Sequence, residues 1–287
     1  MTTSTDVFDM QAAPMRIGTV RLKVRDLDAV SAFYQAVLGL RPIETGSRGV
    51  LLGTGSTPLV EFWGDAALAP RDRVQAGLFH TAFLMPTRAD LARWMAHAKV
   101  AGVPIQGASD HIVSEALYLS DPEGNGIEVY ADRPADRWRT ATGEVRMSTD
   151  PLDVPDLASS AEGTEWSGFP EGGSVGHVHL QVGSTEAADR FYRDILGFGI
   201  AARYPGASFY GSGGYHHQLA GNVWNSRGAG LRPEGMAGLD AVEIVVRDPA
   251  TRDAIAGRVE SAGISADRTG GAIGLCDPWG TRINLRT

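Results

Sequence analysis

The feature that most constrains the fold of this chain is a unit of one strand and one helix that occurs more than once. The segment GHVHLQV (176–182) alternates polar and apolar residues, as a half-buried strand does. The segment ADRFYRDILGF (188–198) then has apolar residues at helical spacing and a glycine near its end. The segments IGTVRLKV (17–24) and VSAFYQAVLGL (30–40) repeat this order, and the letters FY and LG of the two helices coincide. The chain therefore contains an internal repeat.

Two further copies of the unit follow from strand and turn signals. The segments GLFHTAFLM (77–85) and GLDAVEIVV (238–246) open these copies, and a helical pattern follows each of them. Short alternating segments between glycine-rich turns then indicate hairpin strands. Before the last strand, DPEGNGIE (121–128) matches DPWGTRIN (277–284). We therefore predict four βαβββ modules, which cover residues 17–63, 77–132, 175–225 and 237–287.

The segments outside the modules have a different composition. Residues 133–174 are rich in proline, glycine, serine and acidic residues and show little periodicity. This stretch is too long for an ordinary loop, so we expect a linker that wraps the surface. Residues 1–16 are expected to be a flexible tail. The modules then fall into two domains, residues 17–132 and residues 175–287.

Charge and composition exclude several classes of protein. The net charge is −8, the isoelectric point is near 5.4, and no run of basic residues occurs. These values argue against a nucleic-acid or anionic-membrane partner, and no apolar segment reaches membrane-spanning length. The single cysteine, Cys276, excludes an internal disulfide and fits a reducing cytoplasm. Because it lies in the apolar run AIGLC, we expect a buried, inert thiol.

The repeated unit also resembles a known family. Modules with FY...LG helices and DPxG turns resemble the vicinal oxygen chelate superfamily of glyoxalases, bleomycin-resistance proteins and ring-cleaving dioxygenases. Longer segments, among them SDHIVSEALYLSDPEGNGIEVYADRP and GGYHHQLAGNVW, are similar to catechol 2,3-dioxygenases of the extradiol type. The resemblance covers residues 17–287. It implies an α+β fold in which the four βαβββ modules pair into two cupped, barrel-like mixed β-sheets with flanking helices.

In folds of this family, each module of a pair offers a metal-facing position on its first and last strands. The first and fourth modules have no histidine at those positions. The two middle modules have His80, Glu128, His177 and His217. Pairing the modules in sequence order would split these side chains between two incomplete cups, so we predict a nested pairing of module 2 with module 3 and of module 1 with module 4. For metal bonds of ~2.1 Å, more than roughly 4 Å between the ligand nitrogens of His80 and His177 would contradict this hypothesis.

Three of these four residues indicate which metal ion the site would bind. Two imidazoles and one carboxylate on one face of an octahedral ion leave adjacent positions open, as in non-haem Fe(II) oxygenases. His80, Glu128 and His177 supply this set, and a catechol would chelate through both hydroxyl oxygens while O₂ takes the remaining position. Zinc suits the same ligands but has no accessible redox change. We therefore expect Fe(II), with Mn(II) as the second choice.

The resemblance also implies residues that handle protons. His217 matches the acid-base histidine of extradiol enzymes, although it would be a fourth metal ligand in a glyoxalase-like site. Tyr118 would hydrogen-bond or deprotonate the substrate hydroxyl, or it would merely pack in the cup. His111 would steady the oxygen bound to the ring. A histidine suits these roles because its pKa lies near working pH.

The remaining polar residues near these positions are expected to play supporting parts. His179 and His216 would hydrogen-bond to the metal ligands from behind or contact the substrate. Asn222 and Trp224 would line the pocket or cap the core. Gln218 stands where relatives tend to carry a third histidine, and strand alternation turns it away from the side of His217.

These observations together predict a cytoplasmic extradiol dioxygenase. It would use Fe(II) and O₂ to open a catechol-like ring beside the diol, giving a product of the muconic semialdehyde type. One alternative is a glyoxalase-like lyase or isomerase, in which a non-redox ion polarises a carbonyl. Another is a binding protein that sequesters an aromatic metabolite or antibiotic. We expect a small aromatic diol as substrate, no nucleic-acid or membrane partner, and, from the resemblance alone, a homo-oligomer.

Overall fold

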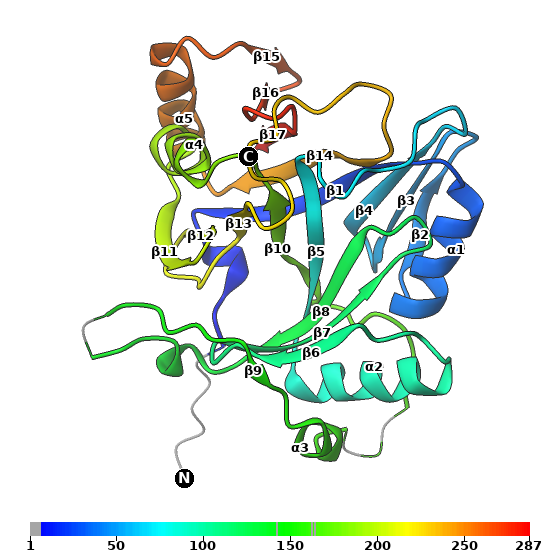
Figure 1. Cartoon of the computed structure of the whole chain (residues 1–287). Coiled ribbons are helices and arrows are strands. Elements are labelled where there is room, and N and C mark those ends of the chain that lie inside the picture. Colours follow the sequence, from blue (N-terminus) through cyan, green and yellow to red (C-terminus); the bar gives the residue numbers. More distant parts are fainter. Residues whose placement is uncertain (1–6, 142, 162, 164) are drawn as a thin grey trace.

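The computed structural model describes residues 7–141, 143–161, 163 and 165–287 (Figure 1). Each predicted module forms a strand, a helix and three further strands. The first module consists of β1 (Met15–Val24), α1 (Leu27–Leu38), β2 (Arg41–Thr45), β3 (Gly49–Thr54) and β4 (Thr57–Gly64). The second consists of β5 (Gly77–Met85), α2 (Arg88–Val100), β6 (Gly107–Asp110), β7 (Ser114–Ser120) and β8 (Gly126–Asp132).

The second half of the chain repeats the same order. The third module consists of β10 (Ser174–Gln181), α4 (Thr185–Asp189), the π-helical stretch η3 (Arg190–Ile195), β11 (Gly199–Tyr204), β12 (Ala207–Gly211) and β13 (Leu219–Asn222). The fourth consists of β14 (Gly238–Val246), α5 (Pro249–Ser261), β15 (Ala266–Thr269), β16 (Ala272–Cys276) and β17 (Arg282–Arg286). The helix predicted at 188–198 therefore begins a few residues earlier. It ends at Ile195 with Leu196 as its C-cap, and Gly197 follows with a φ of +91°, a conformation that favours glycine.

Local capping explains where the helices of the modules begin. In each of them an oxygen of a capping side chain accepts a hydrogen bond from the backbone N–H three residues later, which satisfies one of the free donors of the first turn. The capping residues are Asp26, Thr87, Ser184 and Asp248. Helix α1 ends at Gly39 in the left-handed conformation.

The strands form two sheets that confirm the predicted nested pairing. One sheet has the order β15-β16-β17-β14-β1-β4-β3-β2, and the other has the order β11-β12-β13-β10-β5-β8-β7-β6-β9. The modules join through antiparallel pairs of their first strands, β1 with β14 and β5 with β10. Each sheet therefore combines one module from each of the predicted domains, 17–132 and 175–287.

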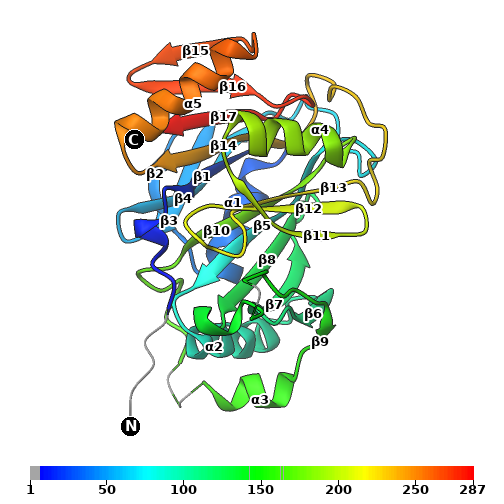
Figure 2. The ribbon, with the colours of Figure 1, turned by 90° about the vertical axis from the view of Figure 1, so that its left-hand side faces the viewer.

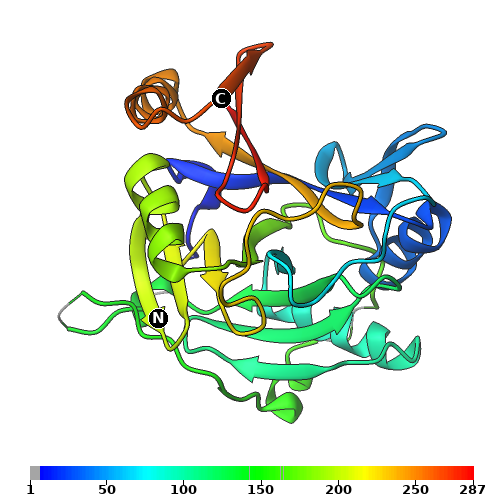
Figure 3. The same cartoon turned by 45° about the horizontal axis from the view of Figure 1, so that its top comes forward.

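The core lies between the two sheets and under their helices. The central strands of one sheet contact those of the other, β1 with β10 and β14 with β5 (Figure 3). Figure 2 shows α4 and α5 at one end of the molecule and α2 at the other. The alternation predicted for β10 is confirmed, because Val178 and Leu180 belong to the core while His177 and His179 face a cavity. None of the described helices is long and apolar enough to cross a membrane.

The segment 133–174 is more than a surface linker. It contains η2 (Ala135–Arg137), β9 (Asp150–Pro151) and α3 (Val154–Ser159), and β9 pairs with β6 at the edge of the second sheet. Trp138, Leu157 and Phe169 are buried. These anchors hold the segment against the modules.

Two further expectations are wrong. Of the predicted flexible tail 1–16, residues 1–6 lie outside the described residues, but Met10 is buried against Trp138 and Tyr215, and the ring of Phe8 packs on the same two aromatic rings. Cys276 is exposed rather than buried. Its neighbour Leu275 points into the core, so alternation turns Cys276 to the other face of the strand.

Candidate metal centre and active site

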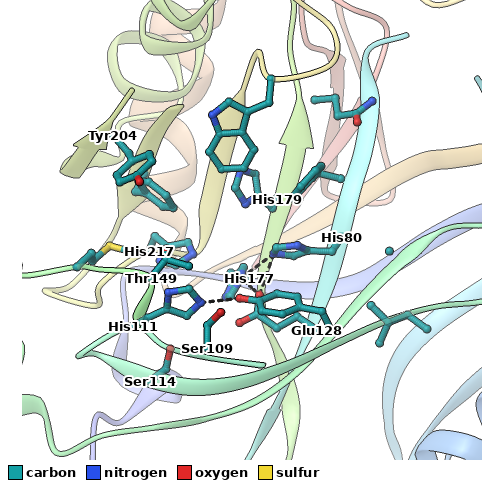
Figure 4. A pocket seen from close by; sticks show the side chains of 18 of the residues that line it. His80, Ser109, His111, Ser114, Glu128, Thr149, His177, His179, Tyr204 and His217 are labelled. Carbon is teal, nitrogen blue, oxygen red and sulfur yellow. Dashed lines mark hydrogen bonds and ion pairs between the residues drawn. The ribbon is translucent and has the colours of Figure 1, made fainter. Parts of the chain in front are cut away.

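The second sheet encloses a cavity of about 750 Å³ on its concave face (Figure 4). Strands β5, β7, β8 and β10 supply its floor, and β11 and β12 supply one side wall. Residues 144, 145 and 147–149 of the linker form another part of the wall. The cavity thus combines both middle modules and the segment that joins them.

Three buried side chains meet in this cavity, each from a different strand. His80 comes from β5, Glu128 from β8 and His177 from β10, and β5 lies between the other two strands. The Nε2 atom of His80 is 2.9 Å from Oε2 of Glu128 and 3.3 Å from Nε2 of His177, which is 3.1 Å from the same Oε2. Ligands at right angles around an ion with bonds of ~2.1 Å lie about 3 Å apart. The three residues therefore fit one face of an octahedral ion, and the predicted limit for the two histidines is met.

The protonation states of the group also suit a metal. Burial acts to raise the pKa of Glu128, but the neighbouring His177 and His80 outweigh it and hold that pKa well below its usual range. Burial lowers the pKa of His177 to about 4. At neutral pH the carboxyl group is therefore ionised and His177 is neutral, which are the forms that metal ligands require.

A second chain of polar groups leads to His217. Nε2 of His216 lies 2.8 Å from Oδ1 of Asp132, and Nδ1 of His216 lies 2.9 Å from Nδ1 of His217. A carboxylate only accepts hydrogen bonds, so Nε2 of His216 carries a proton, and Nδ1 of a neutral His216 must accept from Nδ1–H of His217. Nε2 of His217 is then unprotonated. Burial, followed by the nearby imidazoles of His177 and His216, holds the pKa of His217 well below its ordinary value.

Tyr118 and His111 form a third polar group beside the triad. The Tyr118 hydroxyl lies 2.6 Å from Nε2 of His111, and Nδ1 of His111 lies 2.6 Å from the carbonyl oxygen of Ser148. Because a carbonyl only accepts, Nδ1 carries the proton of a neutral His111. Burial, with the charge of Glu128 and a hydrogen bond to it, raises the pKa of Tyr118 well above its ordinary value. Tyr118 is therefore a phenol at neutral pH.

The turn that carries His111 is strained. Ile112 has a φ of +71°, and it is the sole residue other than glycine with a positive φ among those described. A β-branched residue is rarely found in this region, and such strain gathers at functional sites. The N–H of Ile112 donates to Oδ1 of Asp110 at 2.8 Å, and the N–H of His111 donates to the carbonyl oxygen of Ser114. These bonds hold the backbone of His111 in place.

Aromatic rings cover the side of the cavity next to His179. The ring of His179 lies 5.0 Å from that of Phe79, 5.8 Å from that of Phe209 and 5.5 Å from that of Trp224. Its Nε2 atom is buried and has no hydrogen-bond partner among the described residues. Burial, with the nearby His80 and His177, holds the pKa of His179 well below its ordinary value. This part of the wall is therefore uncharged.

The structure thus gathers most of the predicted residues in one place. His80, His111, Tyr118, Glu128, His177, His179, His217 and Trp224 line the cavity. His216 lies behind His217, and Asn222 is buried with its Oδ1 accepting from the N–H of Trp224.

One prediction about this region rested on the wrong reason. The residues of HHQ precede β13 and are not part of a strand, so alternation does not set the direction of Gln218. Its side chain is buried and bonds to both the N–H and the carbonyl oxygen of Ser212. Gln218 therefore supports the loop before His217.

The sequence analysis missed several lining residues. Ser148 lies in the linker, where no periodic signal marks it, and Phe79 is the neighbour of His80. Arg71 and Arg73 come from the loop before β5, where no periodic signal points to the cavity.

Comparison with known proteins agrees with this geometry. The family model of the glyoxalase/bleomycin resistance protein/dioxygenase superfamily matches residues 16–129 and 174–285. The chain is 38% identical over 268 residues to catechol-2,3-dioxygenase of Bacillus subtilis (strain 168), a match that covers 91% of this chain and 93% of that protein. It is 29% identical over 120 residues to biphenyl-2,3-diol 1,2-dioxygenase 3 of Rhodococcus globerulus, covering 41% of this chain and 63% of that protein.

Solved structures show the same fold at lower identity. Glyoxalase I from Zea mays superposes with a TM-score of 0.57 at 18% identity and covers 96% of this chain and 93% of its own. The cppA protein from Streptococcus pneumoniae TIGR4 gives a TM-score of 0.53 at 11% identity, covering 96% of this chain and 99% of its own. With the family model matched over both halves, the chain belongs to the glyoxalase/bleomycin resistance protein/dioxygenase superfamily.

Proposed function

We propose that this chain is an extradiol ring-cleaving dioxygenase that acts on catechol or a substituted catechol with Fe(II) and O₂. The observation that carries the proposal is the group of His80, Glu128 and His177, whose ligand atoms lie within 3.3 Å of one another in the cavity. The identity to a catechol-2,3-dioxygenase over 91% of the chain supports the same reaction. The product would be a muconic semialdehyde.

The donor set favours a redox-active ion. Two imidazoles and one carboxylate suit Fe(II), Mn(II) and zinc alike. Fe(II) would supply the path for electron density from a catecholate to dioxygen, which zinc lacks because it has no accessible redox change. We therefore propose Fe(II) as the resident ion and Mn(II) as the second choice.

His217 is the proposed base for the substrate hydroxyl. Its Nε2 atom is unprotonated when Nδ1–H donates to His216, and burial keeps the ring neutral at neutral pH. A proton taken up at Nε2 would be stabilised through His216 by the carboxylate of Asp132. The same proton can later be returned, so one residue would act as base and then as acid.

Tyr118 is proposed as a donor and not as a base. Its pKa is raised by burial and by Glu128, so the hydroxyl keeps its proton at neutral pH. The hydroxyl can donate to Nε2 of His111 or to an oxygen of the substrate. His111, held by Ser148, would steady the oxygen that is bound to the ring.

The alternatives fit the site less well. A glyoxalase-like site would use His217 as a fourth ligand, but the group of potential ligands found among the described residues has three members, and His217 is not one of them. Nδ1 of His217 is also occupied by His216. A protein that only sequesters an aromatic compound needs neither three matched ligands nor the Asp132–His216–His217 chain.

Anaerobic loading with Fe(II), followed by catechol and air, tests the proposal. We expect oxygen uptake together with a yellow ring-opened product, and loss of both in His80→Ala. His97→Ala is the matched control, because His97 is a histidine of α2 that stacks on Trp166 and does not line the cavity. Absence of uptake with catechol and several substituted catechols, although one ion is bound per chain, would contradict the proposal.

A further inference from the structure

We propose that the physiological substrate is a catechol with a carboxylate on a short side chain, and that Arg73 binds this carboxylate at the end of the cavity away from the metal group. The proposal rests on the proposed function and names the substrate class for the same site. It follows from where the Arg73 side chain lies, which charges surround it, and what separates it from the three proposed ligands.

Strand β10 fixes how far the backbone of Arg73 lies from His177. His177, His179 and Gln181 lie on the same face of this strand and all line the cavity. Four residues of strand separate His177 from Gln181, which corresponds to about 13 Å. Nε2 of Gln181 donates to the carbonyl oxygens of Arg73 at 3.0 Å and of Gln75 at 2.8 Å. The backbone of Arg73 is therefore held at the far end of the row.

A second element places the guanidinium at the same level. Nη2 of Arg73 lies 4.0 Å from the position that a Cβ atom would take at Gly124. Gly124 lies in the turn before β8 and lines the cavity, four residues before Glu128. The guanidinium of Arg73 therefore lies beside the turn that leads into β8, the strand that carries Glu128.

The charge of Arg73 is not balanced by a neighbour. Arg203, which also lines the cavity, pairs with Asp189 at 2.7 Å. Arg71 donates to the carbonyl oxygens of Gly124 and Leu78, and the charge of Asp121 acts on it. Arg73 is exposed to solvent where it lines the cavity, and it forms no ion pair with any described residue.

The carboxylates that line the cavity do not neutralise the charge of Arg73 either. They are Glu128, which belongs to the metal group, and Glu144, which lies on the linker. In a chain of net charge −8, an unpaired guanidinium facing the cavity attracts an anionic ligand group. A guanidinium matches a carboxylate with two parallel hydrogen bonds.

The cavity wall between the metal group and Arg73 favours a substrate with an apolar linker between its ring and its carboxylate. Phe79, His179 and Trp224 lie along this path, and Trp224 is 45% exposed although it is a large apolar side chain. A diol chelated at the metal group fills only the near part of the 750 Å³ cavity. Against the ~13 Å of strand between His177 and Gln181, a carboxylate attached directly to the ring reaches less far than one carried two or three bonds beyond the ring.

A matched pair of substrates tests the proposal in the Fe(II)-loaded enzyme. The pair is dihydroxyphenylpropionate and the dihydroxyphenylpropanol that has a hydroxyl in place of the carboxylate. We expect kcat/KM to be roughly tenfold higher for the acid, the effect of one hydrogen-bonded charge. Arg73→Gln should remove this preference by raising KM for the acid, so that the acid and the alcohol have similar kcat/KM values. Arg73→Lys should keep part of the preference for the acid, because lysine retains the positive charge but cannot form the two parallel hydrogen bonds of a guanidinium.

Arg227→Gln is the control for general electrostatics. Arg227 is an exposed residue of the loop after β13, it does not line the cavity, and its loss changes the net charge by the same amount. Equal turnover of acid and alcohol by the wild type would overturn the proposal. So would an equal effect of Arg73→Gln and Arg227→Gln on the acid.

Binding to the metal-free protein separates this proposal from the proposed reaction. Phenylpropionate has no diol, and quenching of tryptophan fluorescence, with Trp224 beside the path, reports its binding. We expect the affinity to fall roughly tenfold in Arg73→Gln and with rising ionic strength. If no catechol is turned over but the binding of phenylpropionate still depends on Arg73, the proposed dioxygenase reaction is contradicted and the proposed carboxylate site is supported. Binding that is the same in both proteins would overturn the site.

Discussion

Asp132→Asn should slow turnover without removing the metal. Oδ1 of Asp132 accepts from Nε2 of His216 at 2.8 Å and from the hydroxyl of Tyr215 at 3.2 Å, and His216 in turn holds His217. The substitution keeps the shape but removes the charge that stabilises a proton on the chain of imidazoles. A hydrogen bond to a charged group contributes about 1–2 kcal/mol more than a neutral one, so kcat should fall roughly 5- to 30-fold.

The assay is oxygen uptake with saturating catechol, normalised to bound iron. Asp277→Asn is the matched control, because Asp277 is buried and, like Asp132, accepts from a tyrosine hydroxyl, that of Tyr192 at 2.7 Å, but it belongs to module 4 in the other sheet. The folded control protein should keep its kcat. An Asp132→Asn enzyme with normal iron content and unchanged kcat would refute the role given to the Asp132–His216–His217 chain.

Three further predictions concern the group around the metal. Glu128→Gln should lower the bound iron per chain well below one, measured by metal analysis after gel filtration, because the anionic ligand is lost; full occupancy would contradict its role. Tyr118→Phe should retain iron but lower kcat roughly a hundredfold, since a proton donor is removed; unchanged oxygen uptake would exclude that role. The metal-free protein should lose stability as the pH falls from 6.5 toward about 4, because unfolded His177 takes up a proton in that window and the folded residue does not. The loss should be about 3 kcal/mol in denaturant titrations, and smaller in His177→Gln; equal losses in both proteins would contradict this assignment.

The fold could be predicted because its signals are local and repeated. The FY pair of one module and the DP pair of the next recur in both halves because these residues lie next to each other in the fold. In the second half, the hydroxyl of Tyr192 donates a hydrogen bond to Asp277 in the DPWG turn. In the first half, burial and then the charge of Asp121 raise the pKa of Tyr34 well above its ordinary value, which places the corresponding tyrosine and aspartate near each other. Strand alternation then assigned His177 and His179 to the open face of the sheet.

The parts that could not be predicted depend on contacts between distant segments. Ser148 holds His111 through a backbone carbonyl, and a carbonyl leaves no mark on the sequence. Met10 is buried because Trp138 of the linker and Tyr215 of module 3 meet beside it. The position of Arg73 at the cavity follows from a hydrogen bond to Gln181, more than a hundred residues away.

The central claim is that the chain opens an aromatic ring with both atoms of dioxygen. The most direct test supplies isotopically labelled O₂ to the Fe(II)-loaded protein with catechol and determines the label in the product by mass spectrometry. We expect both labelled atoms in one ring-opened molecule, one in the new carboxylate and one in the new aldehyde, with the aldehyde measured before it exchanges with water. A catechol that is bound but recovered intact and unlabelled, with the ion in place, would contradict the claim.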